Sequence, residues 1–205
     1  MTRAYCIPAQ ALEVVTEVKK SRFIARAEHV TDRQAALAML EQARQDYPDA
    51  RHHCWAYLIG NPAPASSAAM NDDGEPSGTA GKPIVNVIQH KGIGDVMVVV
   101  SRYFGGIKLG AGGLTRAYSG AAESVLSQLP TVVQTPMQSC VLECDFALEQ
   151  QLRHWAGQHN AKIIDVEYAQ SVRLSMEIPD IHWPALEAFS VVHAIGIHRP
   201  DDQGR

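Results

Sequence analysis

Hydrophobic residues at the start of the chain follow a strand–turn–strand pattern and then a helical one. Residues 11–18 and 22–30 are rich in Val, Ile and Phe and are separated by a short polar segment, which predicts a β-hairpin. Thr31 or Asp32 is placed to cap the next helix, in which apolar residues recur until Pro48. The first fifty residues therefore predict a hairpin followed by a helix.

The pattern continues with further strands and helices. Residues 52–60 are strand-like, residues 61–77 have the Pro, Ala and Ser content of a long loop, and residues 82–91 suit a short helix. Residues 96–100 form a continuous apolar run, as expected of a strand buried on both faces. After a glycine-rich loop, one side of another helix is apolar at Leu114, Ala117, Ala121, Val125 and Leu129.

The hydrophobic pattern restarts after Pro130. Strands are predicted at residues 139–146, 162–168, 172–178 and 194–198, and helices at residues 148–159 and 181–191. The resulting order, βαββαβ, is the ferredoxin-like arrangement. A boundary near residues 131–137, marked by Pro130 and Pro136, separates this part from the first.

These patterns predict an α+β protein with two domains, residues 1–133 and 134–205. The composition, 46% hydrophobic and 20% charged, is ordinary for a globular protein. The net charge of −4 is unevenly distributed, because residues 1–135 carry 13 basic and 12 acidic side chains whereas residues 136–205 carry 5 and 10. Any anion-binding surface is therefore expected in the first part, whose net charge is +1, and not in the second, at −5.

Several classes of protein are disfavoured by what the sequence contains. No apolar run is long enough to span a membrane and the N-terminus lacks a signal pattern, so we expect a cytoplasmic protein without membrane contact. The cysteines Cys6, Cys54, Cys140 and Cys144 form no CxxC pair and match no zinc-site spacing. We expect reduced, largely buried thiols and neither a metal nor a cofactor.

The glycine-rich loop is the strongest candidate for an anion-binding site. Its glycines are Gly105, Gly106, Gly110, Gly112 and Gly113. A loop between a buried strand and a helix start can direct backbone N–H groups at an anion, and Arg102, Lys108 and Arg116 add positive charge without a nearby acid. The loop matches neither the P-loop nor the complete GxGxxG pattern. The alternative is that its glycines serve tight turns and close approach of the backbone.

Three consecutive residues, His52, His53 and Cys54, carry candidate chemistry on a predicted strand. Successive strand side chains face opposite ways, so His52 and Cys54 share one face and His53 the other. The two histidines therefore do not easily hold one metal ion. A His–Cys nucleophilic pair, a ligand-binding His52 and a purely structural role remain alternatives.

The segment DDGEP places Asp72, Asp73 and Glu75 close together. Neighbouring carboxylates bind hard cations or act as acid and base, but Asp-Gly followed by Glu-Pro is also a strong turn signal, which we favour. Thr79 and Lys82 follow, and they are candidates to cap the next helix or to contact an anion.

Two further sets of residues are candidates for RNA contact. Lys20 and Arg22 belong to a basic hairpin tip, where a solvated turn and a phosphate contact are the alternatives. Aromatic residues that lie among basic ones are candidates for stacking on a base: Tyr57, Tyr103, Phe104 and Tyr118. Aromatic residues in strands more often belong to the core.

The sequence blocks just described resemble a known family. The segments VTEVKKSRFIARAEHV, ARHHCWAY, DDGEPSGTAGKP and SRYFGGIKLGAGGLTRAY occur in the order and spacing of the IMPACT/YigZ family, which is linked to translation. The resemblance implies a ribosomal-protein-like βαβ domain at the N-terminus and a ferredoxin-like domain at the C-terminus. Similar fold types lie side by side in elongation factor G, an analogy that favours contact with RNA or the ribosome.

We therefore expect a non-enzymatic, RNA- or ribosome-associated regulator of translation whose binding face centres on Arg102, Lys108, Arg116 and the glycine-rich loop. The alternative is a hydrolase of a phosphorylated or nucleotide-like small molecule. A pocket that gathers His52, Asp73, Glu75 and Arg102 would favour the enzyme, and an open basic face the binder. The acidic C-terminal domain is a candidate surface for a protein partner.

Overall fold

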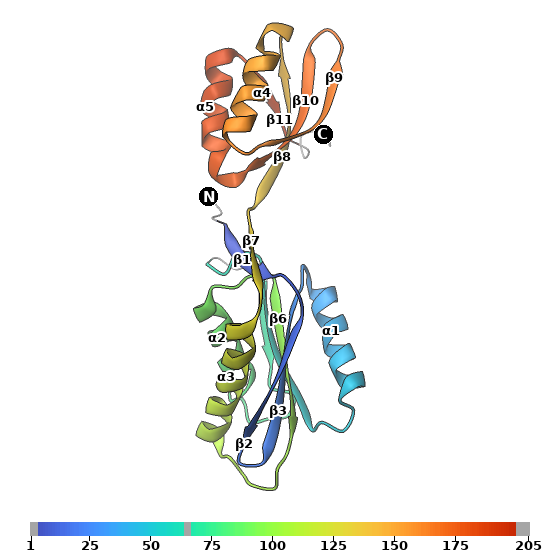
Figure 1. The fold of residues 1–205 in the computed structure, drawn as a ribbon, viewed down its shortest axis with the longest axis vertical. Coiled ribbons are helices and arrows are strands. Elements are labelled where there is room, and N and C mark those ends of the chain that lie inside the picture. The colour runs from blue at the N-terminus through green and yellow to red at the C-terminus, as the bar shows by residue number, and fades with distance from the viewer. Residues whose placement is uncertain (1–3, 64–66, 200–205) are drawn as a thin grey trace. The chain divides into compact units, whose positions relative to one another are not determined.

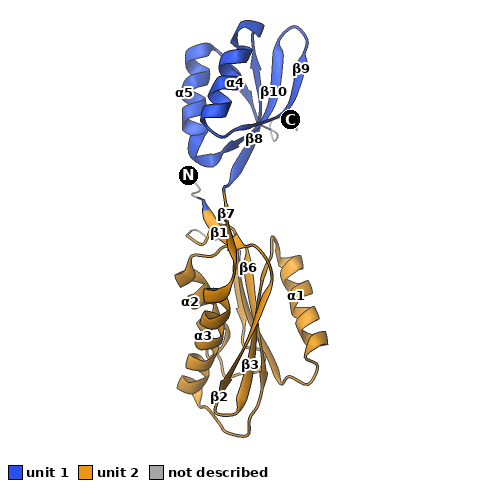
Figure 2. Ribbon diagram, in the orientation of Figure 1, with its two compact units in different colours: residues 1–4, 135–205 blue, residues 5–134 orange. Residues whose placement is uncertain are grey.

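The protein has two compact units, shown in Figure 1 and Figure 2. The computed structural model describes residues 4–63 and 67–199. One unit spans Tyr5–Gln134 and the other contains residues 135–199. Within these described ranges no sheet is shared between the two units, and each contains both helices and strands, so the predicted α+β class with two domains is confirmed.

A five-stranded sheet forms the centre of the N-terminal domain. The strands of this domain are β1 (Tyr5–Pro8), β2 (Leu12–Val18), β3 (Ser21–His29), β4 (His52–Ile59), β5 (Ser67–Asn71), β6 (Val96–Tyr103) and β7 (Thr131–Gln134). Its helices are α1 (Arg33–Asp46), α2 (Gly81–Lys91) and α3 (Ala111–Gln128). The order in the main sheet is β2-β3-β6-β4-β5, with every neighbouring pair antiparallel.

The apolar run of β6 makes it the central strand. Seven of its eight residues are buried, because helices cover both faces of the sheet. Figure 1 shows α1 on one face and α2 with α3 on the other. Phe23, Ile84 and Tyr118 belong to the core beneath α2 and α3, whereas Met39 and Met97 belong to the core beneath α1.

The predicted hairpin and first helix are confirmed. Strands β2 and β3 pair from Leu12↔Ala27 to Val18↔Ser21. Asp32 caps α1, since its carboxylate accepts a hydrogen bond of 2.8 Å from the backbone N–H of Ala35.

The predicted loop at residues 61–77 is wrong in part, because it contains β5. This edge strand pairs antiparallel with β4 from Trp55↔Asn71 to Ile59↔Ser67. Its small Ser and Ala side chains hide the alternation that predicts a strand, and the backbone pairing with β4 supplies the order. Residues 64–66 of the predicted loop lie outside the described part of the chain.

The segment predicted as a domain boundary also contains a strand. Strand β7 pairs antiparallel with β1, from Tyr5↔Gln134 to Pro8↔Thr131. Neither strand was predicted, since each has only four residues and β7 is exposed throughout.

The C-terminal domain has the predicted ferredoxin-like order. Its elements are β8 (Met137–Cys144), α4 (Glu149–Gln158), β9 (Lys162–Tyr168), β10 (Val172–Pro179), α5 (Trp183–His193) and β11 (Gly196–His198). The antiparallel sheet has the order β11-β8-β10-β9. Leu152 and Trp155 of α4 and Leu186 of α5 pack with alternate residues of β10 in a core separate from those of the N-terminal domain.

The cysteines and the helices of the described residues relate to two expectations from the sequence. All four cysteines are free, and Cys54, Cys140 and Cys144 are buried. Among residues 4–63 and 67–199, no helix is both long enough and apolar enough to cross a membrane.

Candidate functional site

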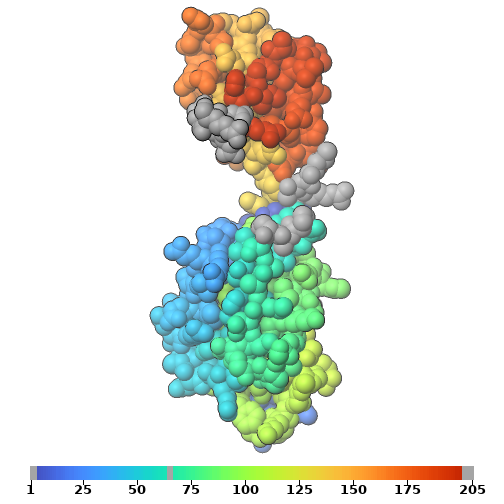
Figure 3. Space-filling view, turned by 180° about the vertical axis from the view of Figure 1, so that it is seen from behind, coloured from blue at the N-terminus to red at the C-terminus, as the bar shows by residue number. Residues whose placement is uncertain are grey.

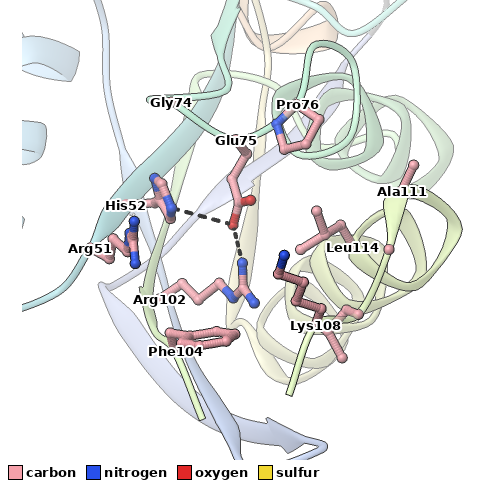
Figure 4. Close-up of a pocket in the computed structure, with 12 residues that line it drawn as sticks. Arg51, His52, Gly74, Glu75, Pro76, Arg102, Phe104, Lys108, Ala111 and Leu114 are labelled. Carbon is pink, nitrogen blue, oxygen red and sulfur yellow. Dashed lines mark hydrogen bonds and ion pairs between the residues drawn. The ribbon is translucent and has the colours of Figure 1, made fainter. Parts of the chain in front are cut away.

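A cavity of about 410 Å³ opens in the N-terminal domain (Figure 4). It lies where β4 begins, where β6 ends, and where the loop after β5 meets the glycine-rich loop that leads into α3. In the space-filling view of Figure 3, the green segment after β5 lies beside the yellow-green glycine-rich loop at one end of this domain. The side chains that carry chemistry in the cavity wall are Arg51, His52, Glu75, Arg102, Phe104 and Lys108.

Arg102 lies at the centre of this site. It follows the apolar run of β6 and pairs across the sheet with Phe23 on one side and His52 on the other. Its side chain is only 7% exposed and its guanidinium lies between the rings of Phe23 and Phe104, at 5.4 and 5.7 Å. One terminal nitrogen donates to Glu75 Oε1 at 2.5 Å, whereas the buried Nε has no hydrogen-bond partner in the described part of the chain.

Glu75 is the acidic partner of Arg102 and its side chain is 4% exposed. Its Oε1 atom also accepts a hydrogen bond of 2.8 Å from the Tyr118 hydroxyl. Burial, with further contributions from Cys54 and Glu75, raises the pKa of Tyr118, so this hydroxyl remains a neutral donor. Both contacts therefore occupy Oε1, and the other carboxylate oxygen accepts no hydrogen bond from any described residue.

Asp72, in the segment DDGEP, caps helix α2. Its Oδ1 atom accepts from the backbone N–H groups of Ala80 and Gly81, at 2.9 and 2.8 Å, and Oδ2 accepts from Gly78 at 2.7 Å. Burial alone would raise the pKa of Asp72, but these three backbone donors hold it below its usual value. The turn interpretation therefore describes Asp72 well.

Asp73 also has a structural role, and it fixes the orientation of His52. Its Oδ2 atom accepts from the backbone N–H of His53 at 2.6 Å, and Arg44 lies 3.5 Å from Oδ1. The Asp73 carbonyl oxygen lies 2.7 Å from His52 Nδ1. Because a carbonyl only accepts, Nδ1 must carry the hydrogen, and Nε2 of a neutral His52 is an acceptor. Nε2 faces Glu75 Oε1 at 4.0 Å, beyond hydrogen-bond distance (Figure 4).

His53 and Cys54 are structural residues. His53 points to the other face of the sheet, where Nδ1 lies 2.8 Å from Ser101 Oγ, and burial lowers its pKa. Burial raises the pKa of the Cys54 thiol, which lies 3.3 Å from the Tyr118 hydroxyl, so it stays protonated. No group of three His, Cys, Asp or Glu side chains suited to a metal ion occurs in the described residues.

The glycine-rich loop combines close approach with an uncapped helix start. A Cβ on Gly105 would lie 2.0 Å from the backbone carbonyl carbon of Lys20. The backbone N–H of Gly105 donates to Ser21 Oγ at 3.1 Å. Gly110 has a φ of +71°, no described side chain caps α3, and the first turn of this helix contains no acidic residue. The first N–H groups of α3 therefore have no partner within the helix, and they lie at the cavity beside Lys108.

Several predicted site residues lie elsewhere. Arg22 stacks on Tyr103, with 4.5 Å between the guanidinium carbon and the ring centroid, and neither residue lines the cavity. Arg116 is exposed and lines a smaller hollow with Lys19 and Gly113. Exposed residues that also lie outside the cavity wall are Lys20, Lys82 and Gly106.

Thr79 and two of the predicted stacking residues are buried. The Thr79 hydroxyl donates to the Pro76 carbonyl at 2.6 Å, so it caps no helix. Tyr57 and Tyr118 are 3% and 0% exposed, so both belong to the core, the alternative to stacking on a base. Phe104, at 45% exposed, is the aromatic residue of that set that lines the cavity.

Some residues of the site were not predicted. Arg51 immediately precedes β4, and its position next to His52 is the signal that could have identified it. Ser21 was not predicted either, and Tyr118 was named only as a candidate for stacking. Their hydrogen bonds with Gly105 and Glu75 link positions 84 and 43 apart in sequence. The pattern of residue types within a short stretch of sequence contains no signal for contacts between such distant positions.

Comparison with known proteins places the chain in a family. The model of the Impact N-terminal domain matches residues 19–126, and a domain family of unknown function, DUF1949, matches residues 142–189. The chain is 42% identical to the IMPACT family member YigZ of Escherichia coli over 176 residues, which cover 86% of each chain. The chain belongs to the IMPACT family.

A further relative and a solved structure agree with this assignment. An IMPACT family member of Haemophilus influenzae is 34% identical over 91% of this chain and 89% of its own. A crystal structure of a hypothetical protein has a TM-score of 0.70 and 36% identity, and the match covers 97% of this chain and 98% of that one. The residues matched to the Impact N-terminal domain include every cavity residue described above.

Proposed function

We propose that this IMPACT family protein binds RNA through the cavity of its N-terminal domain and acts on translation as an RNA- or ribosome-associated regulator. The observation that carries the proposal is the combination of an exposed aromatic ring, exposed cations and an uncapped helix start around one cavity. Single-stranded nucleic acid is bound by aromatic platforms beside positive charge. Phosphate is also well accommodated at a helix N-terminus.

The charge of the cavity wall supports an anionic ligand. Arg51, Arg102 and Lys108 face a single carboxylate, Glu75, so the wall carries a net charge of +2 when His52 is neutral. Arg102 and Glu75 neutralise each other, and the exposed Arg51 and Lys108 supply the surplus. Phosphate contacts by these two residues would contribute affinity that depends on salt.

The test is the affinity of the protein for a labelled single-stranded oligoribonucleotide, measured by fluorescence anisotropy over a range of salt concentrations. Arg51→Ala and Lys108→Ala should each reduce the slope of log affinity against log salt by about 0.7. Lys162→Ala is the matched control, since Lys162 is an exposed lysine of the C-terminal domain. Absence of binding at low salt, or equal slopes for all variants, would refute the proposal.

A hydrolase is the second candidate, because Glu75, His52 and Arg102 converge in a concave site. Three of the four residues that would favour an enzyme line the cavity, whereas Asp73 supports β4 instead. The 4.0 Å between His52 and Glu75 requires a water or substrate atom to link them. Turnover of a phosphorylated metabolite by the wild-type protein that His52→Ala abolishes would establish this candidate. A broad screen without turnover would remove it.

Association with the ribosome requires a separate test, in which the acidic C-terminal domain is the proposed contact for a protein partner. Capture of ribosomal components by the tagged full-length chain, with and without RNase, separates the two routes. Loss after RNase supports binding through RNA, and retention supports a protein contact.

A further inference from the structure

The cavity has chemistry suited to one particular base. We propose that it binds the Watson–Crick edge of an unpaired guanine nucleotide, with the base inside and the phosphate at the mouth. The inference rests on the proposed RNA-binding function and specifies which unit of the RNA enters the site.

Two hydrogen-bond acceptors define the inner wall of the cavity. In a neutral His52 the Asp73 carbonyl fixes the hydrogen on Nδ1, so Nε2 is an acceptor in the cavity wall, 4.0 Å from Glu75 Oε1. Glu75 presents the carboxylate oxygen that neither Arg102 nor Tyr118 occupies. In Figure 4 this oxygen points away from the two dashed contacts made by Oε1.

The acceptors are also held in place. Arg102 and Tyr118 both donate to Glu75 Oε1, and the guanidinium of Arg102 is fixed between Phe23 and Phe104. A carboxylate so restrained loses little rotamer freedom when a ligand binds. The site is therefore preorganised to receive N–H groups.

Guanine matches two neighbouring acceptors better than the other bases do. Its Watson–Crick edge carries two adjacent donors, the ring N1–H and the 2-amino group. Adenine and cytosine each place one amino donor beside a ring acceptor, which a carboxylate or an imidazole lone pair would repel. Uracil offers one N–H between two carbonyl oxygens. RNA-binding proteins read unstacked bases through hydrogen bonds to this edge.

The remaining groups suit the rest of the nucleotide. Phe104 is 45% exposed, and stacking would use the face of its ring that Arg102 does not cover, with Leu114 among the apolar residues of the wall. Arg51 and Lys108 lie on opposite sides of the Glu75–Arg102 pair in Figure 4, and α3 begins beside Lys108. A phosphate at the mouth can meet these charges and the free N–H groups of the helix.

The first experiment changes the ligand and leaves the protein intact. Calorimetric titration of the full chain with GMP, IMP, AMP and UMP compares bases that differ in their donors, and IMP lacks only the 2-amino group of GMP. We expect GMP to bind roughly 5- to 100-fold more tightly than AMP or UMP, and IMP to lose at least about 5-fold, as one bidentate base contact implies. Equal affinities, or no binding of GMP, would overturn the inference.

The second experiment changes the protein. Phe104→Ala should weaken GMP binding by roughly 5-fold or more, the range for loss of one stacking contact. Phe146→Ala is the control, because Phe146 is a similarly exposed phenylalanine of the C-terminal domain. Glu75→Gln should remove the preference for GMP over AMP. Because this variant leaves Arg102 without its charge partner, its folding is checked by circular dichroism, and the IMP comparison stands if it fails to fold.

Oligoribonucleotides separate this inference from the proposed function. Replacing guanosine by inosine in a single-stranded oligomer should reduce affinity by about the factor found for IMP. If the oligomers bind tightly and this replacement has no effect, the proposal of RNA binding is supported and the proposal of guanine recognition is refuted. If GMP is preferred but no oligomer binds, the site reads a free nucleotide and the RNA-binding function fails.

Discussion

Arg102 and Glu75 are both buried, and neither charge would be tolerated there alone. Removing an ion from water costs several kcal/mol, and only close pairing with further hydrogen bonds offsets that cost. Tyr118 supplies one of those bonds to Glu75. The pair is thus a structural element of the cavity wall whose geometry also fixes the orientation of the carboxylate.

Removing the charge of one partner should show how strongly the stability of the fold depends on the Arg102–Glu75 pair. Arg102→Met is expected to lower the free energy of unfolding by roughly 3–5 kcal/mol, because it leaves a buried carboxylate without its counter-charge. Urea denaturation followed by circular dichroism measures the change. Arg116→Met, at an exposed position, should stay within about 0.5 kcal/mol. The double variant Arg102→Met with Glu75→Leu should recover much of the loss, and a double variant as unstable as the single one would contradict this account.

Asp72 predicts a pH dependence. The backbone donors at the start of α2 hold its folded-state pKa below the unfolded value of about 3.9, so the ionised carboxylate stabilises the fold. This contribution is complete above about pH 4 and disappears as the pH falls through the folded-state pKa. Asp72→Asn should therefore cost about 0.5–2 kcal/mol at pH 7, as loss of a helix cap does, and the cost should shrink in acid.

The control for this prediction is Asp49→Asn, since Asp49 is exposed and its carboxylate makes no hydrogen bond or ion pair with any described residue. Thermal unfolding of both variants and the wild type from pH 3 to pH 7 gives the comparison. A cost for Asp72→Asn that does not vary with pH would show that ionisation contributes nothing.

Residue roles were only partly predictable from the sequence. The turn signal in DDGEP correctly indicated a turn, since the backbone N–H of Glu75 donates to the Asp72 carbonyl at 2.9 Å. It did not indicate that Asp73 accepts from the backbone N–H of His53, 20 positions away. The role of Glu75 depends on Arg102, 27 positions away, and on Tyr118, 43 positions away. Such pairing is set by the register of the sheet and the position of α3, which no local pattern contains.

At the scale of elements, the glycine-rich loop is held against the turn between β2 and β3. Gly105 makes this contact possible, since any side chain would overlap the Lys20 backbone. The contact brings Ser21 within reach of both the loop and Arg102. The position of the loop, and therefore of Phe104 and Lys108, depends on a residue that does not touch the cavity.

Gly105→Ala should displace the loop and weaken the binding of RNA or GMP, with a loss of stability of roughly 1–3 kcal/mol for the overlap. Gly120→Ala is the matched control, because Gly120 lies in α3 with no atom within 4 Å of an added Cβ. Helix propensity predicts that this control is stabilised by up to about 1 kcal/mol. Thermal unfolding and calorimetric titration measure both effects, and unchanged binding in Gly105→Ala would contradict the role of the loop.

Elements with a strong hydrophobic period were predictable, and short strands without one were not. The β2–β3 hairpin and the apolar run of β6 have alternation or burial that leaves few alternatives. Strands β1, β5 and β7 have four or five residues each and owe their order to the backbone of a neighbouring strand. Pairing of this kind depends on tertiary structure and leaves little trace in the side chains.

At the scale of the whole molecule, each domain has its own hydrophobic core. The residues of the three buried clusters divide between the two compact units without overlap. Domains with separate cores usually fold on their own. The net charge of +1 for residues 1–135, against −5 for residues 136–205, is the reason to propose RNA binding by the first part.

A fragment of residues 5–134 should therefore unfold cooperatively and retain the salt-dependent RNA binding of the full chain. Urea denaturation and fluorescence anisotropy test the two halves of this statement. The fragment 135–205 is the control, and it should fold without binding RNA. RNA binding that requires both domains, or a fragment 5–134 without a cooperative transition, would contradict the assignment.

The β1–β7 pairing has a consequence for protein engineering. Tyr5 is the register partner of Gln134, so the chain enters and leaves the N-terminal domain through neighbouring backbone positions. A domain whose ends adjoin can be grafted into an exposed loop of a host protein with little stretching of either chain. The same ends could be joined by a short linker and new ones opened elsewhere. The N-terminal domain is thus as well suited to insertion within a host protein as to fusion at the end of one.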